Sequence, residues 1–138
     1  MISQLVYVSS RKQKCNDDEI KKILAACEKN NPSLNITGVL LYSDSKFIQL
    51  VEGDSKVLLA LYDKIKLDDR HGNIAMISFG PIKEKSFPSW HMGSRKISGN
   101  EVDFKTAILE EDKRIFNNLL NGKQENGMKV LELLKKFF

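Results

Sequence analysis

Short hydrophobic runs with strand-like alternation are separated along this chain by stretches with helical spacing. Residues 3–9 predict a strand, since apolar side chains cluster there without helical periodicity. A helix is predicted next, because Asn16 is a suitable N-cap with Glu19 three residues later. We expect this helix to end near residues 30–32, where Pro32 follows two asparagines. Its apolar stripe has the spacing i, i+3, i+4, i+7, namely Ile20, Ile23, Leu24 and Cys27.

The middle of the chain repeats this alternation of strands and helices. Residues 36–42 and 46–51 predict two strands joined by a turn at 43–45, so we expect a hairpin. A second helix begins after Gly53-Asp54 and stops at 68–72, and two further strands follow at 73–82 and roughly 90–97. The order βαββαββ predicts an α+β, ferredoxin-like sheet with its two helices on one face.

The tail is predicted to cover the second face of that sheet. Residues 102–120 and 125–138 have the apolar stripes of two helices, with a break at 121–123. The strands are apolar on both faces, so the second face needs such a cover. We therefore expect a sheet domain over residues 1–97 and a two-helix extension over 98–138.

Composition favours one ordinary globular domain. The chain has 138 residues, 41% of them hydrophobic, and a net charge of +4. The basic residues are scattered among 18 acidic ones, which argues against a nucleic-acid partner. No apolar stretch approaches the ~20 residues that a membrane span needs. The chain starts directly with a strand-like run instead of a signal peptide, so we expect a cytoplasmic protein with no membrane partner.

Few residues have the patterns that enzymes require. Cys15 and Cys27 fit no metal or redox spacing, and His71 and His91 lie in different elements, so no metal site is expected. The chain contains neither a GxGxxG nor a Walker loop, and it offers no convincing Ser-His-Asp set. We therefore predict that the protein is not an enzyme.

The most informative residue is Gln49, an amide inside an otherwise apolar strand. A buried amide left unpaired costs on the order of 1–3 kcal/mol, so Gln49 is either a structural strut or a contact to something bound. In the predicted topology the first and third strands are adjacent, which makes Tyr7 a neighbour of Gln49. The space between the two helices is then a slot for a flat ligand, with Ile23 and Ile65 on its sides.

Six sequence blocks together resemble the BLUF family, blue-light sensors that use FAD. The resemblance covers residues 4–97 and its blocks occur in the family's order with suitable spacing. They are Leu5-Val6-Tyr7-Val8-Ser9, Asn30-Asn31-Pro32, Asn35-Ile36-Thr37-Gly38-Val39-Leu40-Leu41-Tyr42, Phe47-Ile48-Gln49-Leu50-Val51-Glu52-Gly53, Asp68-Asp69-Arg70-His71-Gly72-Asn73 and Phe87-Pro88-Ser89-Trp90-His91-Met92.

The resemblance implies a role for each matching residue. Tyr7 matches the tyrosine that donates an electron and a proton to the excited flavin, and Gln49 matches the glutamine that bridges the two. Asn31 matches the asparagine at the polar edge of the flavin. Trp90 and Met92 match a switching pair, of which one member lies near Gln49.

Further positions match the flavin surroundings of the family. Lys64, Asp68, Arg70 and His71 correspond to the region that meets the ribityl and phosphate groups. Cys27 stands where other members often have a serine, so one hydrogen bond near the ring is in doubt. Each residue also has a purely structural interpretation: core packing for Tyr7, Trp90 and Met92, helix termination for Asn31, and a helix-dipole contact for Arg70 and His71.

The implied function is that of a photoreceptor. We expect residues 1–97 to bind FAD, with FMN or riboflavin as alternatives, and to signal through the last strand and the tail to a protein partner or a second copy. The alternatives are a light-independent ferredoxin-like binding module and a flavoenzyme. An RNA-binding module would need exposed aromatic residues on the central strands, and Phe47 is expected to face the helices instead. The Ile23 and Ile65 pair predicts a closed pocket, which argues against a flavoenzyme.

Overall fold

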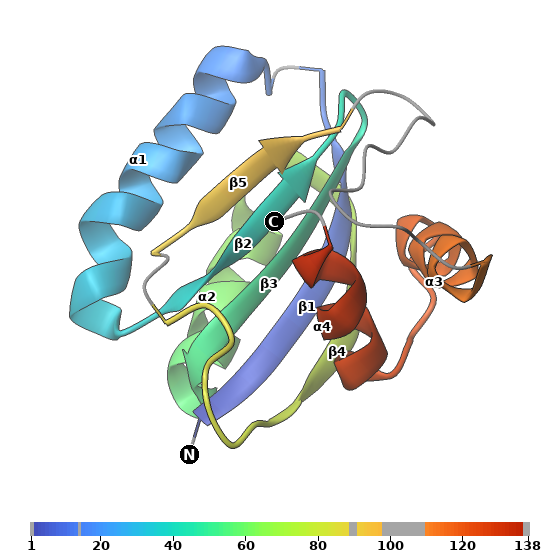
Figure 1. Ribbon diagram of the computed structural model, residues 1–138. Coiled ribbons are helices and arrows are strands. Elements are labelled where there is room, and N and C mark those ends of the chain that lie inside the picture. The colour runs from blue at the N-terminus through green and yellow to red at the C-terminus, as the bar shows by residue number, and fades with distance from the viewer. Residues whose placement is uncertain (1, 14, 89–90, 98–109, 137–138) are drawn as a thin grey trace.

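A five-stranded sheet lies between two layers of helices in the computed structural model, which describes residues 2–13, 15–88, 91–97 and 110–136 (Figure 1). The strand order is β4-β1-β3-β2-β5. All neighbouring strands are antiparallel except β2 and β5, which run parallel. The elements are β1 (Ile2–Arg11), α1 (Asp17–Leu34), β2 (Thr37–Tyr42), β3 (Lys46–Asp54), α2 (Ser55–Leu67), β4 (His71–Pro81), β5 (Gly93–Lys96), α3 (Glu110–Leu120) and α4 (Gly127–Lys135).

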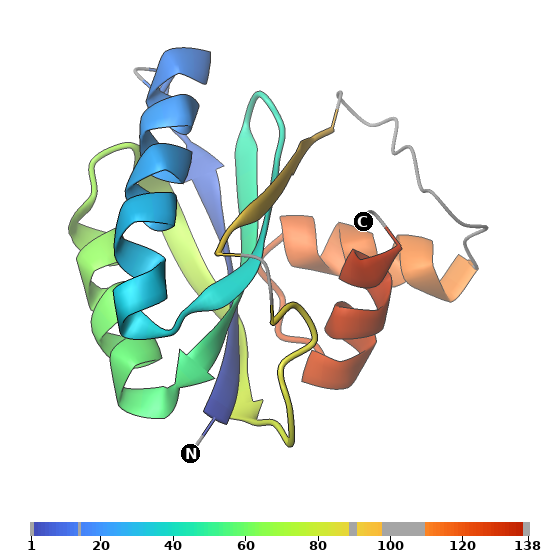
Figure 2. The same ribbon diagram turned by 60° about the vertical axis from the view of Figure 1, so that its left-hand side comes forward.

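The two faces of the sheet are covered as predicted. Figure 2 shows α1 and α2 on one side and α3 and α4 on the other. Along β3, side chains alternate between these faces, so Gln49 and Val51 point to α1 and α2 while Ile48 and Leu50 point to the tail helices. The tail buries its apolar stripes against the second face with Ile115, Phe116, Leu119, Val130, Leu131 and Leu134. The ferredoxin-like α+β fold and the hairpin of β2 and β3 are therefore confirmed.

The first helix is longer than the sequence analysis predicts. Its N-cap is Asn16, whose side chain accepts a hydrogen bond from the backbone of Glu19. The helix does not end near residues 30–32 but continues to Leu34, with Pro32 inside its last turn. It stops at Asn35, which has a φ of 53° and donates its backbone N–H to the carbonyls of Asn31 and Pro32. This left-handed cap satisfies the carbonyls of Asn31 and Pro32 at the helix end.

The last strand is shorter than predicted. The predicted strand at 90–97 begins only at Gly93, where pairing with Val39 of β2 starts. Met92 therefore precedes β5 instead of lying inside the predicted strand. Trp90 lies outside the described residues. The fourth strand begins earlier than predicted, at His71, which pairs with Arg11.

The tail helices are shorter in the described residues than the sequence predicts. Residues 102–109 of the first and 137–138 of the second lie outside the described part. The second helix begins at Gly127 because Asn126 is its N-cap, and its side chain accepts from the backbone of Met128 and Lys129. Gly122 adopts a φ of 73° at the predicted break between the helices.

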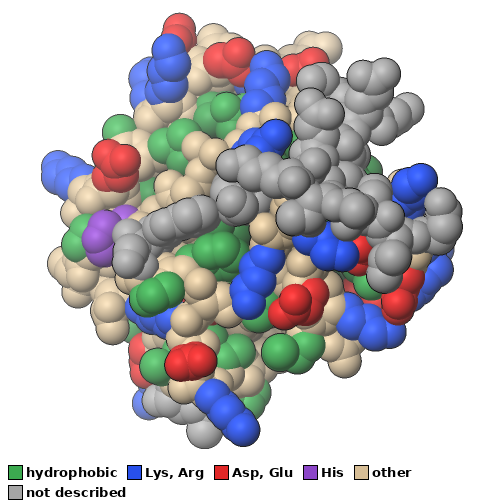
Figure 3. Space-filling model, in the orientation of Figure 1, with side chains coloured by type: hydrophobic (Ala, Val, Ile, Leu, Met, Phe, Trp, Pro, Cys, Tyr) green, Lys and Arg blue, Asp and Glu red, His purple; other side chains and the backbone are tan. Residues whose placement is uncertain are grey.

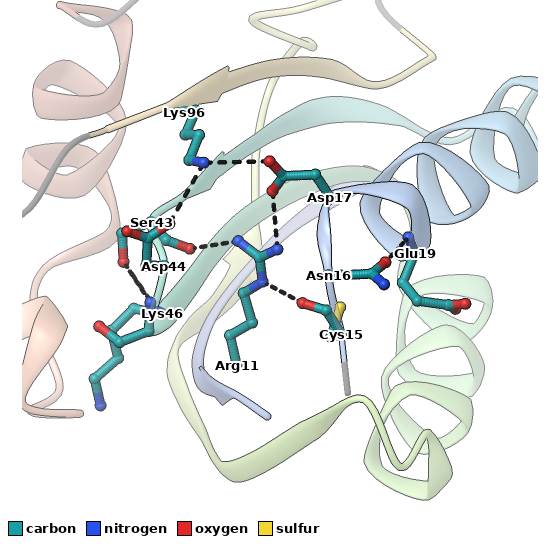
Figure 4. A network of polar contacts seen from close by, with 10 residues as sticks. Arg11, Cys15, Asn16, Asp17, Glu19, Ser43, Asp44, Lys46 and Lys96 are labelled. Carbon is teal, nitrogen blue, oxygen red and sulfur yellow. Dashed lines mark hydrogen bonds and ion pairs between the residues drawn. The ribbon is translucent and has the colours of Figure 1, made fainter. Parts of the chain in front are cut away.

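Polar contacts connect β5 to the rest of the domain at one end of the sheet (Figure 4). The Lys96 ammonium lies 3.4 Å from a carboxylate oxygen of Asp17, at the start of α1, and 3.4 Å from one of Asp44, in the β2–β3 turn. Arg11 donates to the backbone carbonyl of Cys15 at 2.6 Å and to Asp17 at 3.0 Å. The Lys96 contacts connect the end of β5 to α1 and the hairpin, and the Arg11 contacts connect β1 to the start of α1.

Candidate functional site

A cavity of about 460 Å³ lies between α1 and α2, with β1 and β3 as its floor. Its volume is in the range of small-molecule sites. The lining includes Tyr7, Ile23, Ala26, Cys27, Asn30, Asn31, Ser33, Leu34, Leu40, Phe47, Gln49, Leu61, Lys64, Ile65, Asp68, Arg70, His71 and Met92. Every predicted site residue within the described part of the chain is therefore brought to this one cavity.

A second hollow of about 590 Å³ lies beside β4 and residues 124–126. It is larger, but it contains none of the predicted site residues. Its lining also lacks the convergent apolar walls and buried amides of the cavity between α1 and α2. We therefore place the candidate site between α1 and α2.

Tyr7 and Gln49 form the polar centre of the cavity floor. They are direct partners in the antiparallel pairing of β1 with β3, so their side chains project to the same face. The Tyr7 hydroxyl donates to Oε1 of Gln49 at 2.5 Å, and both side chains are buried. Burial raises the pKa of Tyr7 well above its usual value, and the nearby Cys27 thiol raises it further. The phenol is therefore held in its neutral, proton-donating form.

Met92 lies beside Gln49 and contacts the other end of its amide. Nε2 of Gln49 lies 3.4 Å from the sulfur of Met92, within hydrogen-bonding reach for a thioether. The sequence left open whether Trp90 or Met92 lies near Gln49; among the described residues, Met92 does. Trp90 falls outside the described residues, so its predicted role stays a prediction.

Asn31 connects the cavity wall to the segment that carries Met92. Its Nδ2 donates to the backbone carbonyl of His91 at 2.6 Å. Asn31 is buried in the last turns of α1, and its backbone carbonyl accepts a hydrogen bond from the N–H of Asn35, the C-cap of that helix. One turn earlier, burial raises the pKa of the Cys27 thiol, and a hydrogen bond with Asn31 partly offsets this. Cys27 is therefore a neutral thiol on the cavity wall.

Apolar side chains from both helices form the side walls. Ile23 comes from α1 and Ile65 from α2, and both line the cavity while remaining partly buried. Leu40, the cross-strand partner of Gln49 on β2, and Phe47, two residues before it on β3, add apolar floor next to Gln49. The walls therefore suit a flat, largely apolar ring.

Charged residues gather where α2 ends. Arg70 forms a bidentate pair with Asp68, with an N–O distance of 2.6 Å, and its guanidinium also lies 3.6 Å from Glu19. The hydrogen bond to Arg70 lowers the pKa of Asp68, and the same bond raises the pKa of Arg70. Lys64 lines the same end of the cavity. Two cations at this end are suited to an anionic group, although Asp68 already neutralises part of that charge.

His71 lies deeper than its predicted place in a helix-dipole contact. It is the first residue of β4, and its ring centroid is 4.6 Å from that of Phe47 and 6.2 Å from that of Tyr7. Its Nδ1 forms a 2.8 Å hydrogen bond with the hydroxyl of Ser9. Burial lowers the pKa of His71, so the ring is neutral at neutral pH. The helix-dipole interpretation is wrong because α2 already ends at Leu67.

Sequence reasoning missed two polar groups around the site. Ser9 holds the His71 ring, and Glu52 is fully buried on the opposite face of β3 from Gln49. The signal for Glu52 was present, because an acidic residue inside a buried strand requires partners. For Ser9 no pattern in the sequence indicates the contact, which depends on the register between β1 and β4.

The residues present fit a flavin. An isoalloxazine ring needs apolar contact on its faces, which Ile23 and Ile65 supply. It also needs hydrogen-bonding groups at its edge, which Gln49 and Asn31 supply. Among the described residues, no group of three or more His, Cys, Asp or Glu side chains is arranged to hold a metal ion. Over that same part of the chain, no helix is long and apolar enough to span a membrane.

The face of the molecule that Figure 3 shows has mixed charge. In Figure 3, basic and acidic side chains are interspersed rather than gathered into one basic patch.

Comparisons with known proteins identify relatives of this chain. The family model described as "Sensors of blue-light using FAD" (BLUF) matches residues 2–93. Photoactivated adenylate cyclase subunit beta of Euglena longa is 31% identical over 94 residues, which is 67% of this chain and 11% of that protein. The chain thus spans only about a tenth of the length of the first curated relatives.

Two solved structures resemble the whole described domain. The photo-activated state of BlsA has a TM-score of 0.75 at 27% identity, and the match covers 99% of this chain and 94% of that one. A bacterial light-regulated adenylyl cyclase has a TM-score of 0.70 at 34% identity, with coverage of 96% of this chain and 36% of that one. Both likenesses extend over the tail helices as well as the sheet.

Proposed function

The chain belongs to the BLUF family of blue-light sensors that use FAD, and from this premise we propose that Tyr7 and Gln49 form its light-driven switch. BLUF domains are flavin-binding sensor modules, so the prediction of a sensor rather than an enzyme is confirmed for this domain. The observation that carries the proposal is the 2.5 Å hydrogen bond between Tyr7 and Gln49 on the floor of a cavity that fits a flavin.

The proposed switch uses the hydrogen bonds of the Gln49 amide. A bound flavin would supply an oxidant that blue light activates. Tyr7 is the electron and proton donor, because its neutral hydroxyl already donates to Oε1 of Gln49. The electron and the proton would pass to the bound flavin, Gln49 would exchange its donor and acceptor ends by rotation or by a change of tautomer, and the electron and the proton would then return to Tyr7. The pocket thereby acquires a second hydrogen-bonding state without net chemistry.

Burial makes these two states distinct. Gln49 is 5% exposed, and its amide contacts Tyr7 on one side and Met92 on the other. Unpaired polar groups are costly in such a low-dielectric site, so intermediate orientations of the amide are disfavoured. A change at Gln49 must therefore alter its contact with Met92.

FAD is the proposed chromophore, with FMN and riboflavin as alternatives. Asn31 and Gln49 are placed to meet the polar edge of the ring. Ile23 and Ile65 are placed to contact its faces, and Cys27 lines the same cavity from α1. Lys64, Arg70, Asp68 and His71 are proposed to meet the ribityl and phosphate side. Lys64 and Arg70 are the cations that would meet a flavin phosphate, although Arg70 is already paired with Asp68 and Glu19.

The proposed output runs from Met92 into β5 and then to the tail. Met92 directly precedes Gly93, the first residue of β5. We propose that residues 1–97 form the sensor, that 98–138 form the output extension, and that the output is contact with a protein partner or a second copy. Trp90 is proposed to exchange with Met92 as part of this relay.

An absorption spectrum before and after blue light tests the proposal. We expect the purified protein to have a flavin spectrum in the dark, a small red shift after illumination, and recovery in the dark. A colourless protein that cannot be reconstituted with FAD would instead favour a light-independent ferredoxin-like binding module.

A further inference from the structure

Glu52 is a buried carboxylate on the side of β3 that faces away from the cavity. It is 0% exposed and lies three residues after Gln49 on the same strand. Its two oxygens accept hydrogen bonds from consecutive backbone groups, the N–H of Ser86 at 2.7 Å and the N–H of Phe87 at 2.8 Å. A buried carboxylate is costly unless it has such donors, so these two bonds account for its position.

The two donors lie in the segment that connects β4 to β5. Phe87 is 7% exposed and packs into the core under the tail helices. Beside it, the ammonium of Lys85 donates to the backbone carbonyl of Asn35 at 2.6 Å. The beginning of this segment is therefore fixed to the sheet and to the end of α1.

The other end of the segment is fixed from the cavity side. Asn31 donates to the backbone carbonyl of His91 at 2.6 Å, one residue before Met92. Only five positions separate Phe87 from Met92. Glu52 therefore holds the chain five positions before Met92, at Phe87, and Asn31 holds it one position before, at His91.

We propose that Glu52 is a positioning residue for Met92. By holding the backbone of Ser86 and Phe87, it fixes the segment so that the Met92 sulfur meets the amide of Gln49. This inference rests on the proposed function in one respect: it takes the Gln49–Met92 contact to govern how long the lit state lasts. The placement of Met92 is itself a property of the dark protein.

Glu52→Gln is the most informative substitution. The amide is nearly the same size as the carboxylate, so the core is retained, but its NH₂ group opposes a backbone N–H where the carboxylate accepted one. The substitution therefore removes at least one of the two bonds and leaves the other weaker, because it is no longer charge-assisted. Thr37→Val is the matched control. Thr37 is the cross-strand partner of Glu52 and is equally buried, and within the described residues its hydroxyl has no hydrogen-bond partner.

The placement of Met92 is measured first, by NMR of methyl-labelled methionine in the dark. The chain has four methionines, so the resonances can be assigned by single substitutions. In Glu52→Gln we expect the methyl resonance of Met92 to shift. In Thr37→Val we expect the Met92 resonance to keep its wild-type position. An unmoved Met92 resonance in Glu52→Gln would overturn the proposal, whether or not the protein responds to light.

The rate of dark recovery is measured second. We expect Glu52→Gln to change this rate by about threefold or more, in the direction in which Met92→Ala changes it. The double variant should recover at the rate of Met92→Ala alone, because Glu52 acts through Met92. If the changes in recovery rate caused by Glu52→Gln and by Met92→Ala multiplied in the double variant, the proposal would be overturned. A wild-type protein with no light response would contradict the proposed function instead, and the NMR result would still decide the placement.

Discussion

The hydroxyl of Tyr7 and the amide of Gln49 meet across β1 and β3, with 2.5 Å between the phenolic oxygen and Oε1. They are paired in the sheet register, so the contact is fixed by the backbone and not by a flexible loop. Nε2 of the same amide faces the sulfur of Met92. One buried side chain thus connects a proton donor to the segment that leads into β5.

Flavin retention should depend on the apolar walls of the cavity. Ile65→Ala removes contact area from the α2 side, and we expect flavin affinity to fall roughly tenfold. Leu59→Ala is the matched control, since Leu59 is on the same helix but 41% exposed and outside the cavity. Equilibrium titration with FAD measures both. Equal losses in the two variants would contradict the assignment of Ile65 to the ring.

Gly38 should not tolerate a side chain. A Cβ at this position would lie 2.0 Å from the backbone oxygen of Leu50, so β2 and β3 would have to separate. We expect Gly38→Ala to lower the free energy of unfolding by on the order of 3 kcal/mol. In Gly80→Ala the added Cβ meets nothing within 4 Å, so little change is expected. Urea unfolding measures the free energy of unfolding of both variants. Equal values for Gly38→Ala and Gly80→Ala would contradict the close approach of β2 to β3 at Gly38.

Stability should fall as the pH is lowered through the usual range of histidine. Burial lowers the pKa of His71 in the folded state, so the unfolded chain binds a proton more readily than the folded one. The stabilisation that comes from the neutral His71 ring is therefore complete above about pH 6.5 and declines below that pH. We expect the melting temperature to drop between pH 7.5 and pH 5.5, and to drop less in His71→Gln. An identical pH dependence in the variant would show that the ring is not the titrating group.

Light should change amide hydrogen exchange beyond the cavity. If Met92 transmits the change at Gln49, exchange in 91–97 and in the tail helices α3 and α4 should differ between lit and dark protein. The difference should be absent in Gln49→Leu, which cannot rearrange its hydrogen bonds. An exchange pattern without any light-dependent change in residues 86–138 would rule out the relay through β5 and the tail.

The sequence predicts the elements that depend on local patterns. The caps at Asn16 and Asp54 fix where α1 and α2 begin, and alternation fixes which face Gln49 occupies. Strand order follows from the βαββαββ sequence of elements, which brings Tyr7 beside Gln49. The order also explains why residues from distant blocks line one cavity.

Other features depend on contacts that no local pattern contains. The end of α1 depends on the left-handed conformation of Asn35, which ends the helix after Leu34, beyond Pro32. The start of β5 depends on where β2 offers a partner, and this leaves Met92 outside the strand. The bonds of Glu52 to Ser86 and Phe87 join positions more than 30 residues apart and appear only in the folded chain.

The light-minus-dark absorption spectrum of the wild type and of Gln49→Leu tests the central claim most directly. Both proteins should retain flavin, because the walls and the charged end of the cavity are unchanged. The wild type should show a reversible red shift, and Gln49→Leu should show none. A shift of the same size and lifetime in Gln49→Leu would contradict the claim that the Gln49 amide is the switch.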